Sequence, residues 1–181
     1  MSESKLTDSE QFSRSLVGAA AHEIGHVLYA FSTGMQEAQV DFQIKKIADG
    51  KGLERRARTY RREYNLSSDT AASGFAGTIA EALILTPDAT PDQIYAQATN
   101  ALGISETDHQ SIETLPEPYR RIVFDRTLLL MRNLLPFIRE QTDQITARVK
   151  EAVDAGEESI GFLYRNPEPI PARVPIRRSL F

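Results

Sequence analysis

The sequence predicts a mainly α-helical domain with a small β-sheet. Two long stretches, residues 8–33 and 119–155, carry apolar residues at the three- and four-residue spacing of an amphipathic helix. A shorter stretch, residues 40–47, alternates apolar and polar side chains, which is typical of a half-buried strand. Because helical patterns cover far more of the chain than strand patterns, we expect the sheet to be the minor part of the fold.

The predicted first helix runs from about Asp8 to Thr33. Thr7 and Glu10 have the spacing of a capping box at its start, and Gly34 suits the position that follows a helix end. A run of small residues at 18–21 would let this helix pack closely against a neighbour.

The strand over residues 40–47 is followed by a turn signal at 49–52 and then by residues 53–65, which contain five arginines. This arginine-rich segment is compatible with a second strand, a mobile loop or a basic helix. The arginines can simply form a solvated face.

Further helices are predicted in the rest of the chain. One begins at Asp69 or Thr70 and ends near Leu85, with Gly74 and Gly77 placed for close helix contact. A second starts at Thr90-Pro91 and ends near Leu102-Gly103, and Ser105 caps a third, short helix in which Asp108 is the third residue. Pro116 and Pro118 then break the chain. The last predicted helix covers 119–155, is kinked or split at Pro136 and is closed by Gly156. Residues 165–181 read as an extended tail rich in proline and arginine.

Composition and charge are those of an ordinary globular protein. The chain has 181 residues, of which 41% are hydrophobic and 25% charged, so one domain can bury a core. The formal net charge of −4 gives no reason to expect nucleic acid as a partner. Cysteine is absent, which excludes disulfides and thiolate metal sites. The chain has neither a signal-peptide core nor an apolar run of about 18 residues, so we expect a soluble, cytoplasmic protein without membrane insertion.

The most informative motif is His22-Glu23-Ile24-Gly25-His26, an H-E-x-x-H pentad inside the first predicted helix. Residues four apart on a helix share a face one turn apart, so both imidazoles can reach one metal ion. Glu23 is offset enough to address a metal-bound water instead of the metal. Roughly 0.3 % of shuffled sequences of this composition would contain the pentad, so an accidental match is a poor explanation.

A catalytic zinc site needs three protein ligands. The metzincin pattern would place glycine and histidine where this chain has Tyr29 and Ser32, so that class is excluded. The candidates for the third ligand are Glu81, Asp108 and His109, or another carboxylate that the fold brings close.

Three segments of the chain resemble one family. Residues 20–28, Ala-Ala-His-Glu-Ile-Gly-His-Val-Leu, resemble the active-site helix in the peptidase domain of FtsH, the membrane-anchored AAA+ protease. Residues 75–84 are similar to that family's aromatic-Gly-Gly-x-x-Ala-Glu-Glu helix. Residues 103–108 are similar to its Gly-Ala-Ser-Asn-Asp segment, with one residue inserted before Asp108. The resemblance covers roughly residues 10–155, including the closing helices.

This resemblance implies an FtsH-peptidase-like helical zincin over residues 1–164, followed by the tail at 165–181. Carried over residue by residue, it makes His22, His26 and Asp108 the zinc ligands and Glu23 the general base. Glu81 would orient a ligand histidine. Zinc would lower the pKa of its bound water and polarise the scissile carbonyl, and Glu23 would pass a proton to the leaving amine.

The departures from the family bear on function. The sequence has no Walker-type glycine loop and no membrane anchor, and Thr78 and Ala82 stand where the family usually has Arg and Glu. We therefore expect an ATP-independent zinc endopeptidase that hydrolyses unstructured or delivered polypeptides. If residues 40–47 lie at a sheet edge, their main chain could hold an extended peptide; otherwise they form an ordinary core strand. Both a monomer and a homo-oligomer are compatible with the sequence.

Two other functions fit the same residues. One is a non-catalytic or regulatory metal-binding protein of the same fold, which would not need Glu23. The other is a soluble metallopeptidase of the repressor-cleaving type, although in that family the second motif follows the pentad more closely than it does here.

Overall fold

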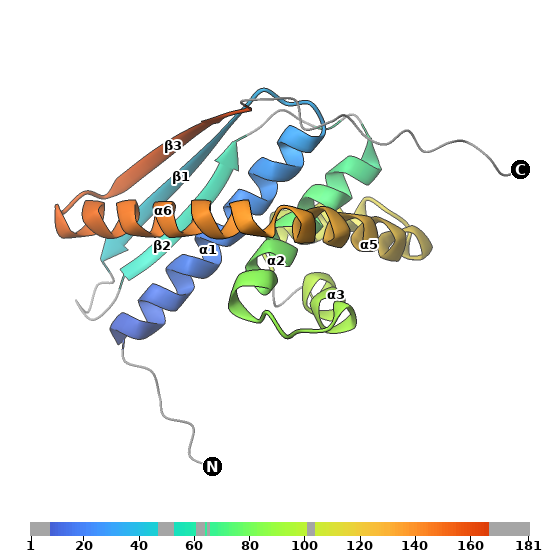
Figure 1. Cartoon of the computed structure of the whole chain (residues 1–181), viewed down its shortest axis with the longest axis horizontal. Helices are drawn as coiled ribbons and strands as arrows, with labels where there is room; N and C mark the ends of the chain where they lie inside the picture. The colour runs from blue at the N-terminus through green and yellow to red at the C-terminus, as the bar shows by residue number, and fades with distance from the viewer. Residues whose placement is uncertain (1–7, 47–52, 61–63, 65, 101–103, 167–181) are drawn as a thin grey trace, which may run out of the picture.

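The computed structural model of the chain describes residues 8–46, 53–60, 64, 66–100 and 104–166 (Figure 1). These residues form a mainly helical fold with one small antiparallel sheet, which confirms the predicted balance of helix and strand. In chain order the elements are α1 (Asp8–Ser32), β1 (Glu37–Lys46), β2 (Leu53–Tyr60), α2 (Ser67–Leu85), α3 (Pro91–Thr99), α4 (Glu106–Glu113), α5 (Glu117–Asn133), α6 (Leu135–Asp154) and β3 (Ser159–Arg165).

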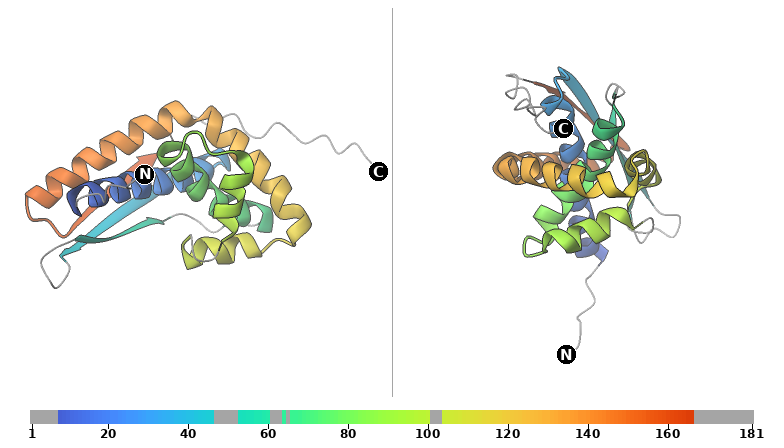
Figure 2. Two further views of the ribbon diagram at one scale, coloured as in Figure 1. Left: turned by 90° about the horizontal axis from the view of Figure 1, so that it is seen from below. Right: turned by 90° about the vertical axis from the view of Figure 1, so that its right-hand side faces the viewer.

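Helix α1 lies at the centre of the molecule, in contact with the sheet, α2 and α6. Figure 2 shows α5 and α6 as consecutive segments of one long arch that runs over α1 and α2. The core at these contacts is fully buried and consists of aliphatic and aromatic side chains, among them Leu16, Ile24, Phe42, Phe75, Ile79, Phe124, Ile138 and Ile145. No helix in the described parts of the chain has the length and apolar character needed to cross a membrane.

The strand order is β2-β1-β3, and both pairs are antiparallel. Val40 pairs with Thr59 on one side and with Phe162 on the other. The predicted strand over residues 40–47 is therefore the central strand, so of the two possibilities, a sheet edge and an ordinary core strand, the structure has the second. The other side of β1 is occupied by β3, a strand that was not predicted. The free edges among the described strands belong to β2 and β3.

The arginine-rich segment, for which strand, loop and helix were all possible, forms the strand β2 over Leu53–Tyr60. Its remaining positions at 61–63 and 65 lie outside the described residues. The alternation predicted for β1 is confirmed, because Val40 and Phe42 are fully buried whereas Gln39 and Gln43 are exposed.

Most predicted helix ends agree with the structure. Gly34 and Gly156 follow α1 and α6 with φ angles of 90° and 77°, a left-handed conformation that glycine adopts without steric cost. The predicted split near Pro136 is present, since Leu134 ends α5 and begins α6. Thr90 caps α3 through a capping box.

Three helix boundaries differ from the prediction. Helix α2 begins at Ser67, upstream of the predicted start. Helix α3 ends at Thr99 instead of near Leu102-Gly103, because Asn100 already has an extended backbone. Pro118 does not break the chain but lies in the first turn of α5, where the missing N–H has no helical partner to lose. Thr7 and the tail beyond Asn166 lie outside the described residues, and Arg165 is the last residue of β3.

The close packing of α1 on α2 depends on glycines, as the small residues predicted. A methyl group at Gly25, inside the pentad, would collide with the backbone of Ala76 on α2. A methyl group at Gly18 would lie 2.9 Å from Oε1 of Glu81. These contacts let the backbones of the two helices approach until the pentad faces α2 directly.

Candidate metal centre

His22 and His26 lie one turn apart on the face of α1 that is packed against α2. Their ring centroids are 4.8 Å apart and the ring planes are inclined by 76°. The side chains are 15% and 9% exposed, so both imidazoles are largely removed from bulk water. Gly77 of α2 makes room for the first ring, because a methyl group there would lie 2.6 Å from Nε2 of His22.

Asp108 reaches the two histidines from α4. Its position is fixed by Ser105, the N-cap of that helix, whose hydroxyl accepts the Asp108 N–H at 3.1 Å and donates to Oδ2 of Asp108 at 2.7 Å. Helix α4 approaches α2 closely at Gly74, where a methyl group would lie 2.8 Å from the carbonyl oxygen of Asp108. Ser105 therefore caps α4 as predicted, and Asp108 is the third residue of that helix.

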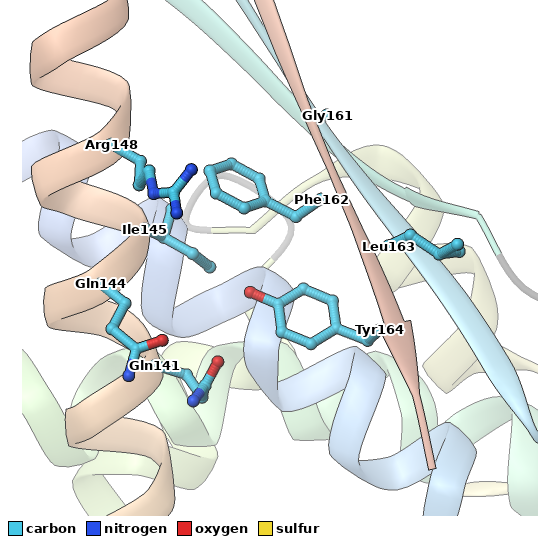
Figure 3. Close-up of a pocket in the computed structure, with 8 residues that line it drawn as sticks. All are labelled: Gln141, Gln144, Ile145, Arg148, Gly161, Phe162, Leu163 and Tyr164. Carbon is cyan, nitrogen blue, oxygen red and sulfur yellow. The ribbon is translucent and has the colours of Figure 1, made fainter. Parts of the chain in front are cut away.

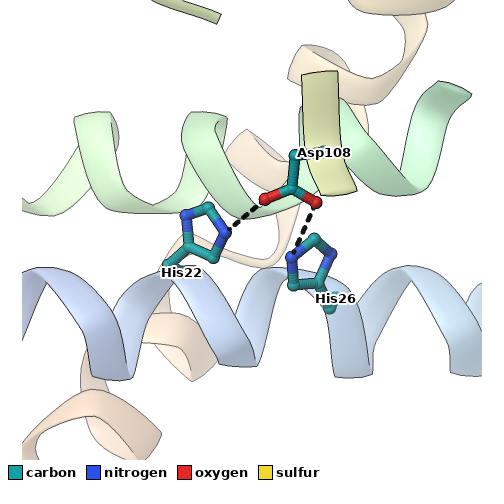
Figure 4. A group of neighbouring side chains, drawn as sticks. All are labelled: His22, His26 and Asp108. Carbon is teal, nitrogen blue, oxygen red and sulfur yellow. Dashed lines mark hydrogen bonds and ion pairs between the residues drawn. The ribbon is translucent and has the colours of Figure 1, made fainter. Parts of the chain in front are cut away.

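The carboxylate of Asp108 bridges the two imidazoles (Figure 4). Its Oδ2 lies 2.9 Å from Nε2 of His22, and its Oδ1 lies 3.4 Å from Nε2 of His26. One ligand atom from each of the three residues lies within 4.8 Å of the others. Ligands at 2.0–2.1 Å from a tetrahedral zinc ion are about 3.3 Å apart. Because both separations between a histidine nitrogen and the carboxylate are near this value, His22, His26 and Asp108 can hold a metal ion.

The second nitrogen of each imidazole also has a polar neighbour. Nδ1 of His22 lies 3.3 Å from Oε2 of Glu81, and Nδ1 of His26 lies 3.5 Å from the hydroxyl of Ser73. Both neighbours belong to α2. Such contacts fix the orientation of a ligand histidine and the nitrogen that carries its proton. Sequence reasoning selected Glu81 but missed Ser73.

The three candidates for the third ligand are now distinguished by position. Asp108 contacts Nε2 of both histidines, whereas Glu81 faces the opposite nitrogen of His22. His109 turns away and pairs through Nδ1 with Glu113 of its own helix at 3.5 Å. The structure thus groups Asp108, and not its neighbour, with the pentad.

Glu23 is 7% exposed and its carboxylate is held by strand β2. The hydroxyl of Thr59 donates to Oε2 of Glu23 at 2.6 Å and lies 3.3 Å from the carbonyl oxygen of the same residue. Sequence reasoning missed Thr59. Only the packing of β2 on α1 brings it to the pentad, and the local sequence carries no signal of that packing.

The charges and hydrogen bonds among these side chains favour a protonated His22 and an ionised Asp108. Burial alone would lower the pKa of His22, but hydrogen bonds with Asp108 and Glu81 raise it to about 10. Burial alone would raise the pKa of Asp108, but the charge of His26 and the contact with His22 hold it well below its usual range. A carboxylate that stays ionised beside two imidazoles is suited to bind a cation.

No protein-family model, curated protein or solved structure matches this chain.

A hollow of about 310 Å³ lies between α6 and β3 (Figure 3). It is lined from α6 by Gln141, Gln144, Ile145 and Arg148 and from β3 by Gly161, Phe162, Leu163 and Tyr164. None of the residues of the metal centre lines this hollow, so it is separate from the chemistry of the pentad.

Proposed function

We propose that this protein is a zinc-dependent endopeptidase with an FtsH-peptidase-like fold. The observation that carries the proposal is the approach of the Asp108 carboxylate to Nε2 of both pentad histidines, at 2.9 and 3.4 Å. Two histidines and one carboxylate form a ligand set typical of catalytic zinc sites that keep a fourth position for water or substrate. The absence of cysteine also favours such a site over a structural one built from thiolates.

In this proposal the residues around the metal have separate tasks. His22, His26 and Asp108 would hold the zinc ion, which when bound acidifies water and polarises the scissile carbonyl. Glu81 and Ser73 would keep Nε2 of each histidine free for the metal by contacting Nδ1. Glu23 would accept a proton and deliver it to the leaving amine as the peptide bond breaks.

The substrate would be an unstructured or delivered polypeptide. Since β1 is paired on both sides, the sheet edge nearest the pentad is β2, whose Thr59 contacts Glu23. An extended peptide can add to such an edge by main-chain hydrogen bonds, which are independent of its side chains. We therefore propose that the substrate pairs with the strand Leu53–Tyr60 and not with residues 40–47.

A non-catalytic metal-binding protein of the same fold is the main competing function. It would need the three ligands but would gain nothing from a buried carboxylate at position 23. The hydrogen bond from Thr59 to Glu23 favours the enzyme, because it holds the carboxylate in a defined place beside the histidines.

The test is the Glu23→Gln variant of the zinc-loaded protein. We expect the wild type to cleave an unstructured polypeptide such as casein, and the variant to be slower by about 100-fold or more while binding zinc equally well, as for loss of a general base. A chelator should abolish cleavage and added zinc should restore it. Undiminished cleavage by Glu23→Gln would exclude the proposed role of this residue, and an inactive zinc-loaded wild type would favour the non-catalytic function.

A further inference from the structure

Strand β3 borders the hollow beside α6 with its main chain as well as with its side chains. Phe162 and Tyr164 point from the strand toward α6, whereas the side chain of Leu163 points away from the hollow (Figure 3). Gly161 also lines the hollow and has no side chain. Gly161 and Leu163 therefore contribute main-chain atoms to this space.

The pairing of β3 with β1 shows in which direction these main-chain groups point. Directly after the strand, the N–H of Asn166 donates to the carbonyl oxygen of Gln36 at 2.9 Å, in continuation of the register between β1 and β3. In an antiparallel pair, every second residue directs both its N–H and its C=O toward the partner strand. Counted back from Asn166, these are the even-numbered residues of β3. The N–H and C=O of Gly161 and Leu163 therefore face away from β1, on the side where β3 has no strand partner among the described residues.

Helix α6 forms the opposite wall with a single face. Its lining residues have the i, i+3, i+4, i+7 spacing of neighbours on a helix surface: Gln141, Gln144, Ile145 and Arg148. Ile145 is fully buried, whereas Gln144 and Arg148 are exposed, so the polar side chains decide what this wall can bind. From Gln141 to Arg148 the helix rises about 10 Å, which is the length of about three residues of an extended chain. A short extended segment therefore fits between the two walls.

Several polar groups of the hollow have no partner in the described parts of the chain. Arg148 forms neither an ion pair nor a hydrogen bond there, although Glu151 is only three residues further along α6. Gln141 and the hydroxyl of Tyr164 also form no hydrogen bond with these residues. Burial raises the pKa of Tyr164 to about 12, so its hydroxyl keeps its proton at neutral pH. A guanidinium, a carboxamide and a phenol all donate hydrogen bonds, and their natural complement is a carboxylate.

We propose that the groove between α6 and β3 binds an extended polypeptide segment as an additional strand of the sheet, with an acidic side chain of the segment on Arg148. The main chain of the segment pairs with Gly161 and Leu163, as in other cases where a peptide adds to a sheet edge. The site holds a polypeptide and does not depend on the proposed peptidase function, because it shares no residue with the metal centre.

The main-chain groups and the charge distinguish this occupant from two others. A small free carboxylate would use Arg148 but leave the N–H and C=O of Gly161 and Leu163 without partners. A second copy of the chain paired through β3 would use those groups. It would bring no carboxylate to Arg148 from that strand, because β3 contains no acidic residue.

The first experiment measures the binding of labelled heptapeptides in which threonine and valine alternate around a central glutamate, glutamine or lysine. Fluorescence anisotropy is recorded with the whole protein and a chelator, so that a metal ion cannot contribute. At low ionic strength the glutamate peptide should bind about tenfold more tightly than the glutamine peptide, and the lysine peptide should bind most weakly. Equal binding of the three peptides, or no binding, would overturn the proposal.

Two variants with the same change in charge test the role of Arg148. Arg148→Gln should abolish the preference for the glutamate peptide. Arg126→Gln changes an exposed arginine of α5 that does not line the groove, and it should keep the preference. If both variants keep the preference, or both lose it, Arg148 is not the residue that binds the carboxylate.

Amide hydrogen exchange, followed by NMR for each residue, tests the pairing with β3. Without peptide, the amides of Phe162 and Tyr164 should exchange slowly and those of Gly161 and Leu163 faster, because only the first two bond to β1. An excess of the glutamate peptide should slow exchange at Gly161 and Leu163 by about tenfold or more. Unchanged exchange at these two amides in the presence of bound peptide would show that the segment does not join the strand.

The same measurements recognise the other two occupants. Slow exchange at Gly161 and Leu163 in a peptide-free protein that sediments as a dimer would assign the edge to a second copy and refute the proposal. N-acetylglutamic acid amide is the probe for a small carboxylate, and its binding as tightly as the heptapeptide would show that main-chain pairing adds nothing. Because no step involves cleavage, a wild type without peptidase activity would refute the proposed function and leave this site standing.

Discussion

The hydroxyl of Thr59 lies 2.6 Å from Oε2 of Glu23 and donates a hydrogen bond to it. This contact joins the second residue of the pentad to β2, one of the two edge strands of the described sheet. A general base is effective only if its carboxylate is oriented toward the proton that it accepts. The strand that we propose to receive the substrate therefore also positions the base.

Replacing Thr59 by valine should lower kcat by about tenfold with little change in KM or bound zinc, because a hydrogen bond to an ionised group contributes roughly 1.5–3 kcal/mol. Valine keeps the branched shape of threonine, so the strand should be undisturbed. Thr59→Ser retains the hydroxyl and should keep most of the activity. Steady-state kinetics with parallel metal analysis measure both variants, and an unchanged kcat in Thr59→Val would show that the contact does not position Glu23.

The assignment of Asp108 as third ligand predicts different outcomes for two adjacent residues. Asp108→Ala should lose bound zinc, because removal of one of three protein ligands leaves two neutral imidazoles. His109→Ala should retain zinc, since that side chain pairs with Glu113 and not with the pentad. Metal analysis of the purified proteins decides the matter. Zinc retained by Asp108→Ala and lost by His109→Ala would reverse the assignment.

Replacing Gly77 or Gly34 by alanine should affect different properties: zinc affinity in the first case and folding stability in the second. A methyl group at Gly77 would lie 2.6 Å from Nε2 of His22, so Gly77→Ala should weaken zinc binding by about tenfold or more. Its folding stability should suffer less, because alanine is favoured over glycine in a helix by about 1 kcal/mol.

Gly34 has nothing within 4 Å of such a methyl group but has a φ of 90°. Gly34→Ala should lower the free energy of unfolding by about 1 kcal/mol and leave zinc affinity unchanged. Zinc titration and chemical denaturation of both variants test the contrast. Equal zinc affinity in Gly77→Ala and the wild type would mean that the ring of His22 moves aside without cost.

Zinc binding should release protons at neutral pH. Although burial opposes it, contacts with Asp108 and Glu81 raise the pKa of His22 from 6.5 to about 10, so the metal-free protein at pH 7 carries a proton that zinc must displace. Zinc affinity should therefore rise with pH up to about 10. Calorimetry in buffers of different ionisation enthalpy counts the protons released. A count of zero at pH 7 would contradict the raised pKa.

The stability of the metal-free protein should have the opposite pH dependence. A raised pKa in the folded state stabilises the fold fully below the unfolded value of 6.5, and this stabilisation is lost as the pH rises toward 10. Denaturation of chelator-treated protein at pH 6 and at higher pH measures the change. Comparison with Asp108→Asn, which removes the charge of the carboxylate beside His22, isolates the share of this pH dependence that the pair of His22 and Asp108 contributes.

Local signals predicted much of the fold and the centre of the site. The pentad predicted that His22 and His26 lie together because a single helix fixes their geometry, and Ser105 predicted the position of Asp108 within α4 because capping is a local interaction. Gly34 and Gly156 marked helix ends for the same reason. Each of these features depends on residues a few positions apart in the chain. That Asp108 joins the pentad was implied by the family resemblance, while the residues alone left Glu81 and His109 equally open.

Features that depend on distant pairings were missed. Strand β3 was not predicted although Ile160, Phe162 and Tyr164 alternate with more exposed positions. Its place beside β1 depends on pairs between distant residues, such as Arg165 with Glu37. The same pairing decided that β1, for which an edge and a core position were both possible, is the central strand. Thr59 and Ser73 lie in the site only because β2 and α2 pack on α1, so their roles required the tertiary structure.

The outer edge of β2, which has no strand partner among the described parts of the chain, also affects how many copies of the protein behave in solution. An unpaired strand can join the same strand of another molecule and start a growing assembly. Arginines on that strand oppose such growth, because two identical edges bring like charges together. Neutralising them, by mutation or by a bound polyanion, should therefore make the protein prone to aggregate.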